Sequence, residues 1–565
     1  MIRRAPSTST SLISGHLARS TASRTTTLTR GLPSFAGHPS FVYKHRPYTT
    51  AGTAITTRSA PVFENPYIDR LKDELTLTQP CFGVRGDEVE VLFEPQDFHK
   101  RLLHIIRNAK RRITISTLYI GVEQQELIEA VREALINSPA LKVTFISDLL
   151  RGTREPFPEP STATLLLTLV AEFPERVEAY FYRSPKLRGL MEQIVPRRFD
   201  EGWGLWHCKW YGADDEVIFT GANLSDSYFT NRQDRYYHLR NAPIILSYLQ
   251  SLLRLYSSYS YRLHPNPPPS ASPHHLMPLA RGGKAGSPGG NQKAALLWRE
   301  PSIHPRAFAA HARATITAFQ RSWREMKRGR RIDIDTWIWP MVQAGVLGIQ
   351  EEEQGVDKVL RAARDMETAW REAQVSHRVM VDLTSGYFGL YKKYKEAVLE
   401  SRAPYKIIAA SPEANGFYGS RGVSHLIPEG YTLLESRFHR DLVQRGRDWN
   451  EQSQKGIELT EWNRPGWTYH AKGIWLSEMT QGQPPKPFGT FIGSSNLSTR
   501  SLKLDVELSN MILTTSPSLQ KALGAEVRGL RAHVARVGEE TWRLPERHVS
   551  WQARALVALG VEGML

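Results

Sequence analysis

The sequence predicts an α/β protein built from two related halves, and three observations support this prediction. Segments with the alternating pattern of strands are interspersed with segments that have the 3.6-residue period of helices. The order of these segments in the first half recurs in the second half, as an internal repeat of domain size. A His-x-Lys pair occurs in each half, at His207 and Lys209 and at His470 and Lys472. We expect two domains, each with a mixed sheet flanked by helices, related by a pseudo-twofold axis.

Residues 1–60 are predicted to be a mitochondrial targeting segment with a disordered continuation. They are rich in Ser, Thr and Arg, contain eight Lys or Arg, and precede the first acidic residue, Glu64. A plain disordered tail is the alternative. Without these eight charges, +8 of the net charge of +16 remains. That excess suits an anionic membrane surface or anionic substrates, and it is not the dense basic stripe that nucleic-acid binding would demand.

Two further features of the composition limit the possible classes. The two cysteines, Cys81 and Cys208, are too few for a disulfide framework or a zinc site. The sequence also has no run of eighteen apolar residues, so any contact with a membrane is expected to be peripheral.

The first domain is predicted to cover residues 61–264. Its expected elements are helices at 93–110, 124–135 and 162–173, and strands at 112–119, 142–147, 177–182, through His207, and at 216–220. A segment rich in Pro, Gly and Ser at 265–295 is predicted to be a linker or a mobile insertion.

The second domain is predicted to cover residues 296–565. Its expected elements are helices at 357–373 and 388–400, and strands at 378–383, 405–410, 431–435, through His470, and at 490–493. We match the strands at 378–383, 405–410 and 431–435 with the first three strands of the first domain. Face-to-face packing of the two copies would bring both histidines to one site.

The His-x-Lys pairs have the residue types that phosphate chemistry needs. Side chains two residues apart on a strand share a face, so His207 and Lys209 would point the same way while Cys208 faces the core. His470 and Lys472 would pair in the same manner. An ammonium holds a phosphate anion, and an imidazole attacks phosphorus or transfers a proton.

Each pair is followed by an Asn-Leu-Ser segment and then by an acid. Asp234 follows Asn223 after eleven residues, and Glu507 follows Asn496 after the same interval. A carboxylate that accepts the proton of one imidazole nitrogen fixes the tautomer and directs the other nitrogen to the substrate. One His-x-Lys pair is weak evidence, whereas two copies with the same spacing to an acid are difficult to obtain by chance.

These residues resemble the phospholipase D superfamily, whose HxKxxxxD motif occurs twice and builds one shared active site. The first copy is complete, with Asp214 in place, whereas Ser477 stands at the aspartate position of the second copy, next to Glu478. The resemblance implies two phospholipase D-like domains. It also implies a catalytic set that consists of His207, Lys209, Asp214, His470 and Lys472.

The resemblance further implies a double displacement without a metal or a cofactor. His207 would form a phosphohistidine, and His470 would protonate the leaving group and then deprotonate the acceptor. The sequence alone allows the opposite assignment. The residues expected to bind the substrate phosphate or to orient a histidine are Asn223, Ser225, Asp234, Asn496, Ser498, Glu507, Arg232 and Arg500.

The segment Thr220–Tyr237 and the order of segments from Phe63 onward are similar to the family of eukaryotic mitochondrial phosphatidylglycerophosphate synthases. The resemblance implies transfer of a phosphatidyl group from CDP-diacylglycerol to sn-glycerol 3-phosphate, on the inner membrane and on its matrix side. Basic residues soon after the two Asn-Leu-Ser segments are candidates for the acceptor phosphate, with plain surface charge as the alternative. They are Arg232, Arg235, Arg500 and Lys503.

The segment 186–198 mixes basic and bulky apolar residues, so it could lie on an anionic leaflet; a helix packed on the sheet is the alternative.

The sequence leaves three other functions open. A lipid hydrolase of the phospholipase D type would use the same residues, and a nucleic-acid phosphodiesterase would need a basic groove with stacking aromatic side chains. A scaffold with a degenerate second motif is the third.

Overall fold

The computed structural model describes residues 63, 65–155, 159–187, 200–267, 276–279, 294–326, 333–374, 377–480 and 482–558. All of them belong to one compact unit. The predicted targeting segment and residues 188–198 of the predicted membrane segment lie outside the described residues. Within the described part of the chain, no helix has both the length and the apolar character needed to cross a bilayer.

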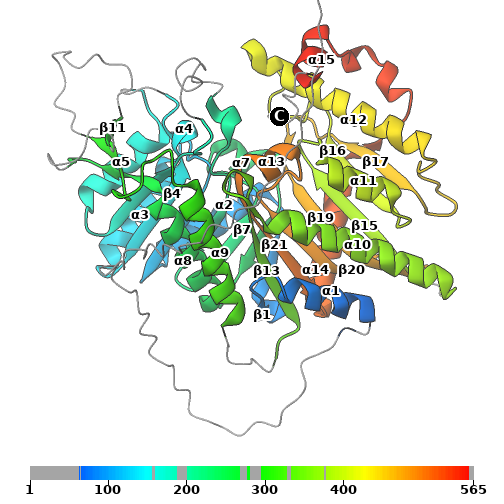
Figure 1. Cartoon of the computed structure of the whole chain (residues 1–565), viewed down its shortest axis with the longest axis horizontal. Coiled ribbons are helices and arrows are strands. Elements are labelled where there is room, and N and C mark those ends of the chain that lie inside the picture. The colour runs from blue at the N-terminus through cyan, green and yellow to red at the C-terminus, as the bar shows by residue number, and fades with distance from the viewer. Residues whose placement is uncertain are drawn as a thin grey trace, which may run out of the picture. The chain divides into compact units, whose positions relative to one another are not determined.

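The first of two ten-stranded sheets has the order β11-β12-β10-β5-β4-β3-β6-β7-β9-β2 (Figure 1). β3, β4 and β5 are parallel, and the pairs from β3 through β6, β7 and β9 to β2 are antiparallel. The strands are β2 (Val89–Leu92), β3 (Arg112–Ser116), β4 (Lys142–Asp148), β5 (Val177–Tyr182), β6 (Trp210–Ala213), β7 (Glu216–Thr220), β9 (Tyr236–Leu239), β10 (Ser260–His264), β11 (Leu276–Pro278) and β12 (Ala295–Trp298).

The second sheet has the order β1-β13-β21-β20-β19-β15-β16-β17-β22, with β14 paired to β13. Its strands are β1 (Phe82–Val84), β13 (Thr336–Ala344), β14 (Ile349–Gln350), β15 (His377–Ser385), β16 (Tyr405–Ala410), β17 (Ile457–Trp462), β19 (Lys472–Thr480), β20 (Lys486–Gly493), β21 (Val506–Thr514) and β22 (Val534–Arg536). A small parallel pair, β8 (Arg232–Gln233) with β18 (Thr468–Tyr469), joins the two halves.

The two sheets repeat one strand order, which confirms the internal repeat. The series β5-β4-β3-β6-β7-β9 has its counterpart in β17-β16-β15-β19-β20-β21, with the same parallel and antiparallel pairs. The strand predicted at 431–435 is wrong, because these residues lie within helix α12 (Leu426–Gln444) and β17 takes that place in the sheet. A short apolar run has no clear period, and the buried Leu433, Phe438 and Leu442 show the helical spacing only over a longer window.

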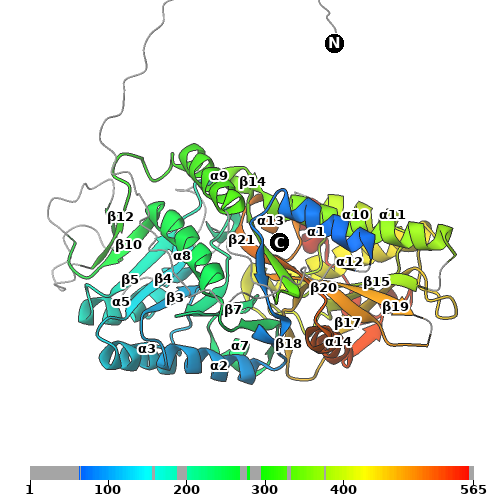
Figure 2. The same ribbon diagram turned by 90° about the horizontal axis from the view of Figure 1, so that it is seen from below.

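Helices cover both faces of each sheet, as the view in Figure 2 shows. α8 packs on β5 and β10 and carries α9, whereas α2 packs on β6 and on α3. α10 packs on β13 and β15, and α14 contacts both β20 and β2, so it spans the two sheets. The helices are α1 (Pro66–Thr76), α2 (Pro95–Arg107), α3 (Gln125–Asn137), α4 (Leu149–Gly152), α5 (Thr162–Glu172), α7 (Asp226–Thr230), α8 (Pro243–Ser258), α9 (Ala309–Glu325), α10 (Glu351–Glu372), α11 (Lys392–Glu400), α12, α13 (Thr499–Lys503), α14 (Pro517–Arg531) and α15 (Trp551–Ala558).

Sheet membership departs from the predicted domain boundaries at both ends of the first half. β1, predicted in the first domain, pairs with β13 of the second sheet. β11 lies inside the predicted linker, and it pairs with β12, which itself pairs with β10 of the first sheet. Composition indicates where regular structure is interrupted, but it does not indicate which sheet the flanking strands join. We keep the division into two domains as a proposal, with the boundaries moved to follow the sheets.

Candidate active site

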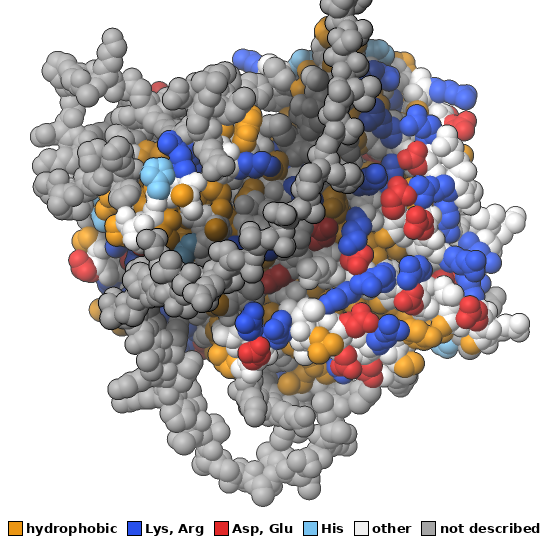
Figure 3. All heavy atoms as spheres, in the orientation of Figure 1, with side chains coloured by type: hydrophobic (Ala, Val, Ile, Leu, Met, Phe, Trp, Pro, Cys, Tyr) orange, Lys and Arg blue, Asp and Glu red, His pale blue; other side chains and the backbone are white. Residues whose placement is uncertain are grey.

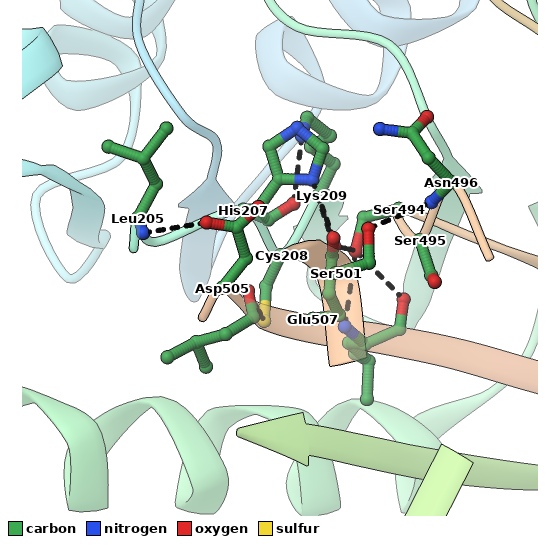
Figure 4. A network of polar contacts seen from close by, with 12 residues as sticks. Leu205, His207, Cys208, Lys209, Ser494, Ser495, Asn496, Ser501, Asp505 and Glu507 are labelled. Carbon is green, nitrogen blue, oxygen red and sulfur yellow. Dashed lines mark hydrogen bonds and ion pairs between the residues drawn. The ribbon is translucent and has the colours of Figure 1, made fainter. Parts of the chain in front are cut away.

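The first motif histidine lies where two distant segments cross. Trp206 forms a parallel bridge with Val506. The His207 N–H donates to the Val506 carbonyl at 2.9 Å, and the Val506 N–H donates to the Leu205 carbonyl at 2.8 Å. The next residue of each segment therefore lies beside its partner, and His207 Nδ1 is 2.9 and 3.0 Å from the two carboxylate oxygens of Glu507 (Figure 4). The sequence predicts a strand through His207, but β6 begins only at Trp210. The bridge between Trp206 and Val506, and not a strand, therefore holds His207 in position.

The second motif histidine is held by the same arrangement with the halves exchanged. Tyr469 of β18 pairs with Gln233 of β8, and the His470 N–H donates to the Gln233 carbonyl at 2.8 Å. The following residues again lie side by side, with His470 Nδ1 2.6 Å from Asp234 Oδ2. Each imidazole is thus oriented by the carboxylate of the other half of the chain. The sequence predicts both carboxylates, and the structure adds that they are crossed.

The nearest partner of Nδ1 in each histidine is a carboxylate oxygen, at 2.9 Å for His207 and at 2.6 Å for His470. This arrangement favours the tautomer with the proton on Nδ1 and the lone pair on Nε2. Burial lowers the pKa of both His207 and His470 well below the usual value, and the nearby Lys209 and Lys472 ammonium groups lower it further. Both imidazoles are therefore neutral near pH 7, which is the form that attacks phosphorus or accepts a proton.

The motif lysines are buried beside the histidines. Lys209 Nζ donates to the His207 carbonyl at 2.8 Å, and Lys472 Nζ lies 2.8 Å from His470 Nδ1 and 3.7 Å from Asp234 Oδ2. Burial lowers the pKa of Lys209 to about 7. The Lys472 charge acts on the pKa of His207 and the Lys209 charge on that of His470, so both motifs share one electrostatic environment.

Burial also acts on the acids. It raises the pKa of Glu507 to about 7, against the attraction of Lys209, and it raises the pKa of Asp234 against the attraction of Lys472. An anionic substrate that reaches these lysines would compete with the carboxylates for the same positive charge.

The two motif asparagines are at the site. Asn223 Nδ2 donates to the Tyr228 hydroxyl at 3.1 Å, and Oδ1 of Asn223 and of Asn496 is buried without a partner among the described residues. Buried amides with an unused polar atom are suited to bind a ligand. Gly221, two residues before Asn223, is required for steric reasons. A Cβ at this position would lie 2.9 Å from both Asp234 Oδ1 and Lys472 Nζ.

The two motif serines have other partners. Ser498 caps α13 by accepting the Ser501 N–H, and Ser225 Oγ is 3.3 Å from the Tyr119 hydroxyl. Ser494 contacts a histidine-orienting acid, because its hydroxyl donates to Glu507 Oε2 at 2.5 Å (Figure 4). We did not predict Ser494, although its position two residues before Asn496 was a usable signal.

The structure places Asp214, which the motif predicts in the catalytic set, away from both histidines, and we propose a structural role for it. It lies in the turn from β6 to β7 with φ of 48°. Its carboxylate accepts the N–H groups of Lys110 at 2.8 Å, Arg111 at 2.8 Å and Arg112 at 3.0 Å. It therefore fastens this turn to the start of β3, at the end of β6 remote from His207.

The role of Asp214 explains why Ser477 is tolerated in the second copy. β19 continues through position 477 to Thr480, and Ser477 is a buried strand residue opposite Pro487 at a shift in register. No turn occurs there for a carboxylate to hold. We infer that no other acid replaces the missing aspartate.

Three of the four basic candidates for the acceptor phosphate have carboxylate partners. Arg235 is buried on Glu526, with its Nε 2.9 Å from Oε1 and its Nη2 3.1 Å from Oε2. Lys503 pairs with Glu353 at 3.1 Å. The Arg500 Nε donates to Asp505 at 3.1 Å. The fourth, Arg232 of β8, pairs with Thr468 of β18, and its Nε donates to the Thr468 hydroxyl at 3.0 Å.

Residues that the sequence did not single out complete the surroundings. The rings of Tyr228 and Tyr387 stand nearly perpendicular to that of His470, with centroids 5.1 and 5.6 Å away, and the Tyr228 hydroxyl is 3.3 Å from His470 Nε2. Tyr228 lies in the segment quoted for the family resemblance. No pattern in the sequence pointed to Tyr387.

Among the described residues, one group of side chains has the spacing of metal ligands. One ligand atom each of His207, Asp505 and Glu507 lies within 4.8 Å of the others. The carboxylate of Asp505 already accepts from the Leu205 N–H at 2.9 Å and from Arg500. That of Glu507 holds His207. Metal independence stays a prediction: EDTA is expected to leave turnover unchanged, and loss of activity that Mg²⁺ or Mn²⁺ restores would contradict it.

Two His-x-Lys motifs that meet in one site on repeated mixed sheets have the arrangement that the resemblance to the phospholipase D superfamily implies, which is a site for phosphoryl chemistry. No family model matches the chain. The solved phosphatidylserine synthase of Haemophilus influenzae has the same fold, with a TM-score of 0.61 and 17% identity over 87% of this chain and 97% of that one.

Curated relatives define the family more closely. The chain is 35% identical to the CDP-diacylglycerol–glycerol-3-phosphate 3-phosphatidyltransferase of Saccharomyces cerevisiae, over 83% of this chain and 87% of that protein. It is 34% identical to the human mitochondrial protein of the same name and 33% identical to that of Gallus gallus, in both cases over 85% of this chain and 84% of the relative. The chain belongs to the CDP-diacylglycerol–glycerol-3-phosphate 3-phosphatidyltransferase family.

Proposed function

We propose that this enzyme transfers the phosphatidyl group of CDP-diacylglycerol to sn-glycerol 3-phosphate by a double displacement on its two histidines. In the first step, Nε2 of His207 attacks the phosphorus that bears the diacylglycerol. The N–P bond forms, the P–O bond to CMP breaks, and CMP leaves with the electron pair on a phosphate oxygen. The covalent phosphohistidine has a cationic ring, and the carboxylate of Glu507 stabilises it through Nδ1.

In the second step, a hydroxyl of glycerol 3-phosphate attacks the same phosphorus. His470 Nε2 takes the hydroxyl proton, the new O–P bond forms, and the N–P bond breaks with its electron pair returned to His207. The neutral state of His470 suits this base role, because its pKa lies below the usual range. The departing CMP spreads its charge over phosphate oxygens, so its departure demands less help from an acid.

One observation carries this proposal: each histidine is oriented by an acid of the opposite half and has the buried lysine of its own motif beside it. Lys209, Lys472, Asn223 and Asn496 would hold the non-bridging oxygens and stabilise the charge of the transition state. The assignment of His207 as the nucleophile remains part of the proposal, because the pKa of both histidines is lowered and each is oriented by a carboxylate.

We place the enzyme in the mitochondrion, as the names of the human and chicken relatives support. We propose that it is peripheral on the inner membrane and faces the matrix, where its substrates would be a membrane lipid and a soluble phosphate ester. The basic and apolar segment 186–198 is the candidate for contact with anionic lipid. Deletion of that segment should lower binding to vesicles that contain anionic lipid more than binding to neutral vesicles.

The central experiment is CMP release from labelled CDP-diacylglycerol by the purified enzyme, with and without glycerol 3-phosphate. We expect release that depends on the acceptor and yields phosphatidylglycerophosphate. The lipid hydrolase is the second candidate, because the same residues could activate water. Phosphatidate formed at the same rate with or without the acceptor would favour the hydrolase.

A nucleic-acid substrate has less support. Over α10 and α11, on the face drawn in Figure 3, Lys and Arg side chains are interspersed with Asp and Glu. Examples are the ion pairs of Asp357 with Arg361 at 3.1 Å and with Lys393 at 3.6 Å. This face has a mixed charge, unlike the basic track that a phosphate backbone requires. DNA binding that weakens steeply with salt would revive this alternative.

A further inference from the structure

Arg232 differs from the other basic residues near the histidines in its partners. Arg235, Arg500 and Lys503 each contact a carboxylate. Among the described residues, no carboxylate lies within ion-pair distance of Arg232, although its charge acts on the pKa of His470 and of Lys472. A guanidinium that is largely shielded from water and lacks a counter-ion is unfavourable by itself, so the arrangement favours an anionic ligand.

The small parallel sheet sets the position of Arg232. Arg232 pairs with Thr468, two residues before the Asp234–His470 contact, and its Nε donates to Thr468 Oγ1 at 3.0 Å. Residues two apart share a face of the strand and are separated by about 7 Å. The Arg232 side chain is therefore expected on the same face as the His470 side chain, two residues away along the paired segments. It also stacks on Tyr228, with its carbon 4.6 Å from the ring centroid.

The backbone at Gly416 packs closely against the guanidinium and the Tyr387 hydroxyl, so this position tolerates no larger residue without a shift of one of them. A Cβ at Gly416 would lie 2.8 Å from the Tyr387 hydroxyl and 3.3 Å from Arg232 Nη2. Nε of Arg232 donates to Thr468 and the guanidinium also interacts with the Tyr228 hydroxyl, so the Nη groups are the part of the fork that would reach a ligand. The hydroxyl groups of Tyr228 and Tyr387 both lie near the guanidinium.

We propose that Arg232 binds the phosphate of the acceptor, a phosphomonoester dianion at one end of a short polyol chain. This inference rests on the proposed function and specifies its acceptor site. The fork holds the phosphate, Tyr228 and Tyr387 donate to its oxygens, and the far hydroxyl reaches Nε2 of His470. An in-line displacement brings the acceptor to the side that the first leaving group vacated, which is the side of His470.

The test compares Arg232→Gln and Arg232→Lys with a matched control, Arg464→Gln. Arg464 lies in the loop just before β18 and stacks on Trp467 at 3.8 Å, and its ion pair among the described residues is a 3.9 Å contact with Glu94. Loss of a charge-assisted, bidentate contact should raise the KM for glycerol 3-phosphate by about 10- to 100-fold in Arg232→Gln. Lys keeps the charge without the fork, so Arg232→Lys should fall between that variant and the wild type. The control should keep the wild-type KM.

The discriminating measurement is the competition between glycerol and glycerol 3-phosphate as acceptors. Wild-type enzyme should prefer the phosphorylated acceptor, and Arg232→Gln should lose most of this preference while its KM for CDP-diacylglycerol changes less than threefold. Gly416→Ala should weaken the same preference by shifting the guanidinium or the Tyr387 hydroxyl. Circular dichroism and thermal unfolding check that each variant is folded.

An unchanged acceptor preference in folded Arg232→Gln would overturn this inference. So would an equal rise in KM for both substrates, because it would assign Arg232 to the shared phosphorus. Failure of the proposed function has a separate signature, since wild-type enzyme would then release CMP without any need for glycerol 3-phosphate.

Discussion

The two halves of the active site agree at one end of the motif and differ at the other. Both His-x-Lys pairs lie at a crossing of chain segments, and both histidines bond a carboxylate from the opposite half. At the last motif position the halves differ, because Asp214 fastens a turn whereas Ser477 is an interior strand residue. The comparison separates residues that the chemistry requires in both copies from a residue that one copy requires for its local structure.

The largest effect is expected for the histidines themselves. His207→Ala and His470→Ala should each lower kcat by about 10⁴-fold or more, because one removes the nucleophile and the other the base. Rapid-quench experiments with labelled lipid should trap phosphohistidine in His470→Ala and none in His207→Ala. The reverse pattern would exchange the two roles, and turnover near the wild-type level in either variant would contradict the mechanism.

The crossed acids are expected to have the next largest effect. Asp234→Asn should lower kcat through His470, and Glu507→Gln through His207, by about a hundred- to ten-thousand-fold, because the amide no longer holds the productive tautomer. The KM values should change little. Single-turnover measurements separate the two, since Glu507→Gln should slow CMP release and Asp234→Asn the second step. If both variants slow the same step alone, the crossed assignment is wrong.

Asp214 and Ser477 provide a paired test of the far end of the motif. Asp214→Ala should lower the free energy of unfolding by about 1–3 kcal/mol through the loss of an acceptor for backbone N–H groups, with kcat within about threefold of the wild type. Ser477→Asp restores the HxKxxxxD sequence of the second motif, but it buries a carboxylate. It should therefore lower the free energy of unfolding by about 3 kcal/mol without a gain in activity. Denaturant unfolding and kcat, measured together, check both variants.

The last prediction concerns stability alone, at a buried acid beside Glu507. Glu352, on the first turn of α10, accepts from the Ser509 hydroxyl at 2.9 Å, and burial raises its pKa to about 8. The neutral form is therefore favoured in the folded state. Its contribution to stability is fully present below about pH 4.5 and is lost as the pH rises toward 8.

Glu352→Gln removes this titration while it keeps the shape. Its free energy of unfolding, relative to the wild type, should rise between pH 5 and pH 8 by an amount on the order of 1–4 kcal/mol. Unfolding in denaturant at several pH values measures the difference. A difference that does not change with pH would mean that the carboxyl is already ionised in the fold.

The sequence by itself determined the parallel strands, the helices with clear periods and the two motifs. These signals are local, because side-chain alternation and helical period depend on neighbouring residues. It also supplied both histidines, both lysines and both acids as candidates. It was wrong for the strand at 431–435, where a short apolar run was compatible with either period.

Only the tertiary structure decided which acid serves which histidine. The partners are 300 residues apart for His207 and Glu507, and 236 apart for His470 and Asp234, so no local pattern relates them. Long-range contacts also determine that Asp214 holds a turn and that Arg232, among the four basic candidates, lies beside His470 without a carboxylate partner among the described residues. Spacing along the chain predicts which side chains share a face, whereas the register between distant segments is set by how the two sheets pack.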